Sequence, residues 1–254
     1  MSGFNVRYVS TQCAWAALVC AMASGCGGGG NSAAVQASYV GSYKGTANIT
    51  SGPHTGQLAV DLVIGSTGAA AFGSDSGSGP FPCLVGTANL GTGAVTLNQV
   101  SEQLSGTVSV SIQLAPGGGS GTITASGSDG TSTGTVSFSS VANVTSPNVG
   151  GYLGTMNLTS GPDTGASWPI QLFVANDGVA SGSTYDPGGD GFSYDGTVNF
   201  ATNAVTLAVH SASDSLSGVT GTLSETISSA TTITGTVSLS NGDAGSVALT
   251  LKAP

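Results

Sequence analysis

One 17-residue stretch occurs twice in this chain. Residues Val40–Gly56 return 109 positions later as Val149–Gly165, and 12 of the 17 positions are identical. This much identity indicates that a whole structural unit has been duplicated, because an internal repeat is the signature of a repeated architecture. The chain has 254 residues, which is enough for two domains of ordinary size. We therefore expect two similar domains, over residues 39–146 and 147–254.

Apolar and polar residues alternate along most of both repeats. Alternation with a period of two is typical of β-strands that bury one face, and disordered chains lack it. Between the alternating segments lie Asn-Gly, Asp-Gly and Pro-rich sequences, which favour tight turns. The pattern predicts eight strands in each repeat. The expected strands lie near 41–50, 57–65, 68–74, 83–90, 93–99, 103–114, 119–127 and 132–140, and near 150–158, 167–175, 178–184, 191–200, 203–210, 214–225, 231–240 and 244–252.

Short turns allow only antiparallel pairing, because parallel strands need long crossover connections. A meander of eight antiparallel strands can close on itself and so remove its two edges. The sequence therefore predicts an all-β protein built from two tandem antiparallel eight-stranded up-and-down barrels. Two β-sandwiches are the alternative.

The alternation also predicts which side chains face the interior. Trp168, Phe192 and Tyr194 share the apolar face of their strands, whereas Asp61 and Gln171 lie on the opposite face. The second repeat carries the larger apolar side chains, so we expect any internal pocket to lie in the first repeat.

Each repeat opens with a Gly-x-Tyr sequence, at Gly41–Tyr43 and at Gly150–Tyr152. This resembles the Gly-x-Trp that begins the first strand of small calycin-type barrels such as lipocalins and avidins. The resemblance implies the barrel topology. It implies no ligand, since Tyr replaces Trp and neither repeat has an Arg in its last strand.

The first 25 residues have the features of a signal peptide. Arg7 supplies a positive charge, and the apolar run Cys13–Met22 that follows is too short to span a bilayer. The next residues, Ala23-Ser24-Gly25-Cys26, resemble the lipobox of bacterial lipoproteins. The resemblance implies cleavage before Cys26, a diacylglycerol on its thiol and a fatty acid such as palmitate on its new amine.

Two or more acyl chains give stable attachment to a membrane. Residues 26–38 are therefore expected to be a lipidated cysteine followed by a flexible Gly/Ser-rich tether. Gly27 after the cysteine resembles lipoproteins that are sent to the outer membrane. The alternative is ordinary secretion after cleavage of the same leader.

The chain carries a net charge of −9, and only 6% of its residues are charged. Without the leader, Lys44 and Lys252 are the only basic residues, against 12 acidic ones. Such a surface cannot neutralise phosphates, so nucleic acid is excluded as an expected partner.

No catalytic set is evident. The two histidines are His54, in a turn, and His210, which lies beside Ser211 and Asp214 at the end of a strand. The members of a catalytic triad converge from separate elements, so we interpret both histidines as surface residues. The sequence Gly130–Gly134 reads Gly-x-Ser-x-Gly, but a strand follows it where a nucleophile elbow needs a helix.

Acidic residues gather once, at Asp186, Asp190 and Asp195. Calcium binds several loop oxygens, but this spacing matches neither an EF-hand nor a Gly-Gly-x-Gly-x-Asp repeat. We interpret the three residues as weak metal candidates and as turn formers, and expect no cofactor. Cys83 is the only thiol beyond Cys26, so we expect a small buried residue and no structural disulfide.

The sequence thus predicts a lipid-anchored protein of a bacterial envelope, without catalytic activity. The first hypothesis is a binding module for a small ligand, a glycan or a protein, with ligand-binding residues that the sequence does not identify. The second is a structural or adhesive surface protein without a defined ligand.

Overall fold

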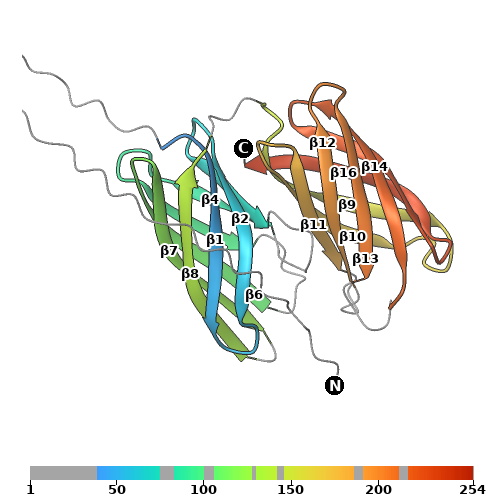
Figure 1. Ribbon diagram of the computed structural model, residues 1–254. Helices are drawn as coiled ribbons and strands as arrows, with labels where there is room; N and C mark the ends of the chain where they lie inside the picture. The colour runs from blue at the N-terminus through green and yellow to red at the C-terminus, as the bar shows by residue number, and fades with distance from the viewer. Residues whose placement is uncertain are drawn as a thin grey trace, which may run out of the picture. The chain divides into compact units, whose positions relative to one another are not determined.

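The computed structural model describes residues 39–74, 83–99, 106–127, 130–141, 146–185, 191–211 and 217–253. All regular structure in these residues is β, and it forms two closed antiparallel barrels of eight strands each (Figure 1). The expectation of two tandem barrels is confirmed, and the sandwich alternative is wrong. The leader, with Cys26, lies outside the described residues.

The first barrel closes because its first and last strands pair with each other. Its strands are β1 (Gly41–Ser51), β2 (Gly56–Ile64), β3 (Ala69–Ser74), β4 (Leu84–Ala88), β5 (Ala94–Gln99), β6 (Gly106–Ala115), β7 (Gly118–Gly127) and β8 (Gly130–Ser140). In the second barrel the first strand likewise pairs with the last. Its strands are β9 (Gly150–Ser160), β10 (Ser167–Val174), β11 (Val179–Tyr185), β12 (Gly191–Asn199), β13 (Ala204–Ser211), β14 (Thr220–Ser229), β15 (Thr232–Leu239) and β16 (Ala244–Ala253).

One expected strand is displaced. The segment expected at 214–225 is β14, which begins at Thr220 and ends at Ser229. Gly218 adopts a φ of 84° in the turn before it, a conformation that few other residues adopt. The apolar alternation continues to Ile227, and Glu225 occupies an inward position within it.

The 17-residue repeat forms the first strand of each barrel and part of the turn after it. A Cβ on Gly45 would overlap the carbonyl oxygen of Ser137, and one on Gly154 would overlap that of Ala248. Only glycine therefore permits the close approach of neighbouring strands at this position. The repeated tyrosine also has one role in both barrels, because each hydroxyl donates to a carbonyl four residues earlier, 2.9 Å away.

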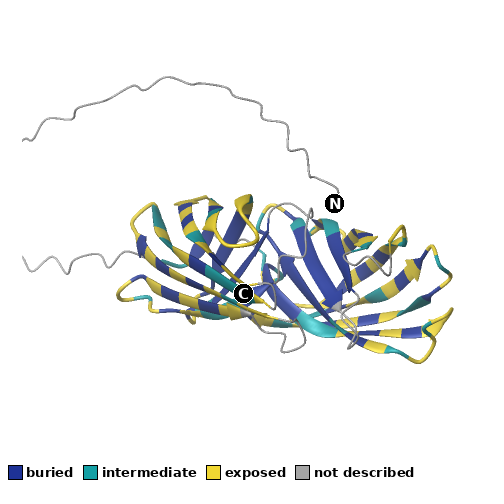
Figure 2. Cartoon of the chain, turned by 90° about the horizontal axis from the view of Figure 1, so that it is seen from below, coloured by how far each residue is buried: buried dark blue, intermediate teal, exposed yellow. Residues whose placement is uncertain are grey.

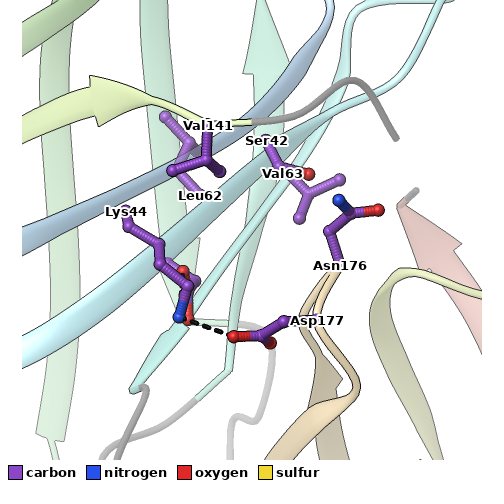
Figure 3. A pocket seen from close by; sticks show the side chains of 8 residues that line it. Ser42, Lys44, Leu62, Val63, Val141, Asn176 and Asp177 are labelled. Atoms are coloured by element: carbon purple, nitrogen blue, oxygen red, sulfur yellow. Dashed lines mark ion pairs between the residues drawn. The ribbon is translucent and has the colours of Figure 1, made fainter. Parts of the chain in front are cut away.

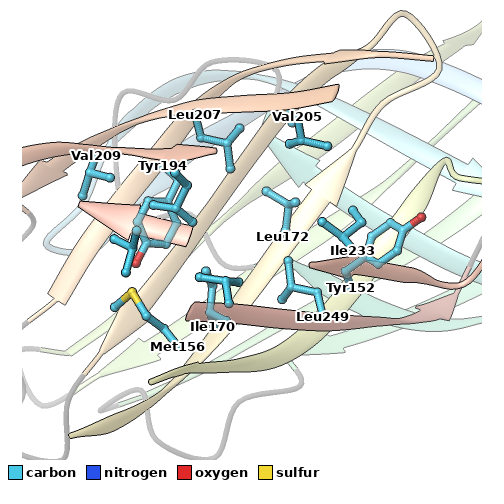
Figure 4. Packing of buried hydrophobic residues seen from close by; sticks show 14 of the residues in the cluster. Tyr152, Met156, Ile170, Leu172, Tyr194, Val205, Leu207, Val209, Ile233 and Leu249 are labelled. Carbon is cyan, nitrogen blue, oxygen red and sulfur yellow. The ribbon is translucent and has the colours of Figure 1, made fainter. Parts of the chain in front are cut away.

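Apolar side chains fill both interiors. In the second barrel Trp168 is 6% exposed, and its ring centroid lies 6.0 Å from that of Phe192. Figure 4 shows Tyr152 and Tyr194 among the aliphatic side chains of this interior. The inward orientation predicted for Trp168, Phe192 and Tyr194 is confirmed. In the first barrel Phe72 and Phe138 pack edge to face at a centroid distance of 6.0 Å.

A third apolar cluster lies outside both interiors, where outer faces of the two barrels touch. Its buried members are Val63, Ala71, Cys83, Val149, Phe173, Ala175 and Ala253. Long stretches of β2, β3 and β10 are consequently buried on both faces, whereas most strands alternate (Figure 2). Asp61 and Gln171 lie on the outer faces as expected, yet they are only 4% and 3% exposed. The prediction of the face was correct, but this part of the outer surface does not face solvent.

Phe173 of the second barrel packs against Gly73 of the first. Its ring lies directly over Gly73, where any Cβ would overlap it. Beside it, the hydroxyl of Ser181 donates to the carbonyl oxygen of Ser74 over 2.7 Å. The contact between the barrels thus combines apolar packing with a buried hydrogen bond.

Among the described residues, no helix is long and apolar enough to cross a membrane.

Candidate functional site between the barrels

A pocket of about 150 Å³ lies beside the apolar cluster, and Figure 3 shows it. It is lined by Ser42, Lys44, Asp61, Leu62, Val63, Val141, Asn176 and Asp177. Six of these residues come from β1, β2 and the position just after β8 in the first barrel, and two from the turn between β10 and β11 in the second. The pocket therefore lies on an outer face of the first barrel and not in its interior. The internal pocket expected in the first repeat stays a prediction.

Three charged side chains form one side of the pocket. Lys44 and Asp61 face each other across β1 and β2, and Lys44 Nζ lies 3.6 Å from Asp61 Oδ1. The same Nζ lies 2.9 Å from Asp177 Oδ2 in the other barrel (Figure 3). Asp61 is buried, whereas the side chains of Lys44 and Asp177 are 36% and 45% exposed.

The turn sequence Asn176–Gly178 determines the position of Asp177. Gly178 has a φ of 85°, and Asp177 Oδ1 accepts a hydrogen bond of 3.2 Å from the amide of Val179. Partial burial raises the pKa of Asp177. Hydrogen bonds and the charge of Lys44 outweigh this effect and lower the pKa below its ordinary value; the bonds come from Lys44 and from the amides of Val179 and of Asp177 itself. Asp177 is therefore ionised near neutral pH and keeps its ion pair with Lys44.

The chemistry of this pocket is hydrogen bonding. It offers two carboxylates, an ammonium group, an amide and the hydroxyl of Ser42, next to the apolar side chains of Leu62, Val63 and Val141. Ser42 Oγ is buried and has no hydrogen-bond partner among the described residues. Among the described residues, the hydroxyl of Ser42 is therefore not hydrogen-bonded to a general base.

The candidates chosen from the sequence are mostly elsewhere. Cys26, Asp186, Asp190 and Asp214 lie outside the described residues. Within the described part of the chain, no three His, Cys, Asp or Glu residues are grouped as a metal site would require.

Asp195 and His210 lie together on the outer face of the second barrel. Their strands, β12 and β13, are neighbours, and His210 Nε2 lies 2.5 Å from Asp195 Oδ1. Ser193 is directly opposite His210 in the register, but no hydrogen bond between them is found in the described residues. Both members of the pair are about half exposed, at 51% and 41%. A surface ion pair, formed when the imidazole is protonated, is the role that this geometry supports.

His54 lies in the turn after β1, as expected from the sequence. Its amide donates to Ser132 Oγ over 3.1 Å, and the amide of its counterpart Asp163 donates to Asp243 Oδ1 over 2.9 Å. Asp243 is fully buried and also accepts a hydrogen bond of 2.7 Å from Asn241. An equivalent turn is thus held in both barrels by a buried oxygen from a neighbouring segment.

The structure confirms the interpretations of the Gly-x-Ser-x-Gly sequence and of Cys83. The Gly-x-Ser-x-Gly sequence lies inside strand β8, so it forms no nucleophile elbow. Cys83 is a free thiol, 2% exposed, in the contact between the barrels. Its burial raises its pKa to about 12, which keeps it protonated and unreactive.

The sequence reasoning missed Lys44, Asp177 and Glu225. The sequence does contain a feature that could have identified Lys44 as a site residue. The second repeat has Leu153 at the same position, and the chain has very few basic residues. Glu225 has such a feature too, because it stands in the apolar series between Leu223 and Ile227.

No protein-family model matches the chain, and no curated protein matches it. Among solved structures, the chain is similar to a protein of unknown function from the DUF3598 family of Nostoc punctiforme. The two are 9% identical, the alignment covers 84% of this chain and 96% of the other, and the TM-score is 0.28. A TM-score this low carries no argument about fold or function.

Proposed function

We propose that the protein is a lipoprotein, anchored through Cys26 to a bacterial envelope membrane, that acts as a non-catalytic binding module. The lipobox-like sequence Ala23–Cys26 and the Gly/Ser-rich segment after it support the anchor. The outer membrane is the proposed location, from Gly27 after the cysteine. The pocket between the barrels is the single structural observation that supports the binding role.

The size of this pocket limits the ligand. Pockets that enclose a small molecule have volumes of roughly 300–1,000 Å³, whereas this one has about 150 Å³. It has room for one unit of a longer ligand. The carboxylates, the amide and the hydroxyl of the pocket can form hydrogen bonds with the hydroxyl groups of a sugar. With two carboxylates and one ammonium group, the pocket has a net negative charge. We therefore propose a neutral or amino-sugar glycan as the ligand.

The anchor is tested by expressing the full chain and Cys26→Ala in a bacterium. The wild-type chain should fractionate with membranes and give a mature N-terminal peptide with the mass of an acylated cysteine. Cys26→Ala should be found uncleaved or soluble, without acylation. An unmodified mature N-terminus in the wild type would contradict the anchor.

The ligand is tested by NMR titration of residues 39–254 with maltooligosaccharides and chitosan oligosaccharides. Shifts should concentrate at Lys44 and Asn176 and should weaken about tenfold in Asp177→Asn, the loss expected when about 1.4 kcal/mol of hydrogen bonding is removed. Asp195→Asn, on the outer face of the second barrel, is the matched control and should bind normally. If neither oligosaccharide causes shifts near the pocket, the glycan proposal is wrong.

A structural or adhesive role is the second candidate, and rows of hydroxyl side chains support it. Ser111, Thr122 and Thr135 are register neighbours on β6, β7 and β8, and all three are exposed. Such an uncharged face can pack against a second copy of the chain. Concentration-dependent association in analytical ultracentrifugation, without any glycan shifts, would favour this role.

A further inference from the structure

A carboxyl group lies inside the second barrel. Glu225 is an inward residue of β14, between the buried Leu223 and Ile227, and is 4% exposed. Both of its carboxyl oxygens are buried and have no hydrogen-bond partner among the described residues. A buried carboxylate in this situation is costly, because it loses hydration without gaining a partner.

The neighbouring strands leave space for this side chain but offer it no charge. Val205 on β13 and Gly235 on β15 are its register partners. A Cβ on Gly235 would lie 2.7 Å from Glu225 Cγ, so the side chain occupies the space that glycine leaves.

The rest of the described interior is almost free of titratable groups. Tyr152 on β9 and Tyr194 on β12 are the titratable residues that face into it, and both are neutral phenols near pH 7. The inward side chains of the other strands carry no charge. They are Trp168, Ile170, Leu172 and Val174 on β10, Ala180 on β11, Val205, Leu207 and Val209 on β13, Ile233, Val237 and Leu239 on β15, and Val247, Leu249 and Leu251 on β16. No inward cation in the described part of the barrel therefore compensates an ionised Glu225.

The first barrel provides a natural comparison. Ile112 on β6 pairs with Val95 and Gly121, just as Glu225 pairs with Val205 and Gly235. The two barrels thus place an isoleucine and a glutamate at the same point of the same fold. An apolar side chain suffices to fill this position, so the carboxyl group is not needed for packing.

We propose that Glu225 is a proton-binding site that makes the stability of the second barrel depend on pH. The folded barrel holds the neutral carboxylic acid, and loss of the proton places an uncompensated charge in an apolar interior. The first barrel, with Ile112 at this point, has no such dependence.

The direction of the effect follows from the two states of the chain. Burial raises the pKa of Glu225 from 4.5 to about 7 in the folded barrel. Between these values the unfolded chain loses the proton while the folded barrel keeps it, so stability falls as pH rises through this window. This is opposite to the usual effect of a carboxyl group in an ion pair. The difference corresponds to about 300-fold tighter proton binding by the folded barrel.

Equilibrium unfolding of residues 39–254 tests the proposal. Trp168 is the only tryptophan in this part of the chain, so its fluorescence reports on the second barrel. From about pH 5 to about pH 8, the unfolding constant of the wild type should rise by about 70-fold relative to Glu225→Gln, because part of the 300-fold difference lies below pH 5. Dividing one unfolding constant by the other removes the pH dependence that arises from titratable groups present in both proteins. Glu225→Ile should behave like Glu225→Gln, and the exposed neighbour variant Ser224→Ala like the wild type.

A second measurement needs no substitution. Glu102 and Glu225 are the only glutamates, so ¹³C-glutamate labelling gives two side-chain carboxyl signals. The signal of Glu225 should titrate with a midpoint near 7. The proposal is wrong if both signals titrate in the ordinary range, or if the ratio of unfolding constants does not change with pH.

Discussion

Phe173 offers the sharpest test of the contact between the two barrels. It lies on the outer face of β10, so its own barrel does not cover its ring, yet it is only 1% exposed. Its burial comes from the first barrel, where it covers Gly73. Phe173→Ala should therefore weaken the contact between the barrels and leave the interior of the second barrel unchanged.

The expected magnitude follows from the burial of the ring. Truncating a buried Phe to Ala costs about 3–5 kcal/mol, through lost transfer free energy and the cavity left behind. Since each 1.4 kcal/mol is a factor of ten, separation of the barrels should become easier by a factor of about 10² to 4 × 10³. If the barrels did not touch in solution, the ring would be exposed and its removal would change stability by less than about 0.5 kcal/mol.

Cys83 provides the assay, because it lies in the same contact. Its Sγ would be only 2.9 Å from a Cβ on Gly151 of the other barrel, and it is the only thiol in residues 39–254. A thiol reagent should reach it only when the barrels separate, so labelling measures that opening.

Phe173→Ala should be labelled at least about 100-fold faster than the wild type. Val141→Ala, at a residue that is 49% exposed, is the control and should be labelled at the wild-type rate. The reasoning is refuted if wild-type Cys83 reacts as fast as an exposed thiol, or if Phe173→Ala leaves the rate unchanged.

Two further predictions concern stability. Trp168→Ala should cost about 3–5 kcal/mol in chemical denaturation, because the indole is buried in the interior, and wild-type emission should be that of a buried indole. Emission typical of water-exposed tryptophan would contradict this. Asp243→Ala should cost about 1–3 kcal/mol, since it leaves the amide of Asp163 without its acceptor. A thermal midpoint equal to that of the wild type would show that the turn does not need this hydrogen bond.

Much of the fold could be predicted from local sequence, for reasons visible at particular residues. The repeated Gly45 and Gly154 mark points where neighbouring strands approach too closely for any side chain. Turn sequences such as Asn176–Gly178 supply the positive φ that a tight connection needs. The candidate site could not be predicted in this way. Lys44 and Asp177 are 133 positions apart, and neither strand pairing nor alternation relates them.

The sequence by itself determined the duplication, the strands, their antiparallel order and the two faces of each strand, because these depend on neighbouring residues and on the period of the chain. Only the tertiary structure decided what covers each face. Asp61 and Phe173 both lie on outer faces, and both are buried because one barrel rests on the other. Glu225 and Ile112 occupy equivalent positions, and only closure of the barrel left the carboxyl group of Glu225 buried without a hydrogen-bond partner among the described residues. Alternation identifies the side of a strand on which a residue lies, whereas burial depends on residues brought there from distant parts of the chain.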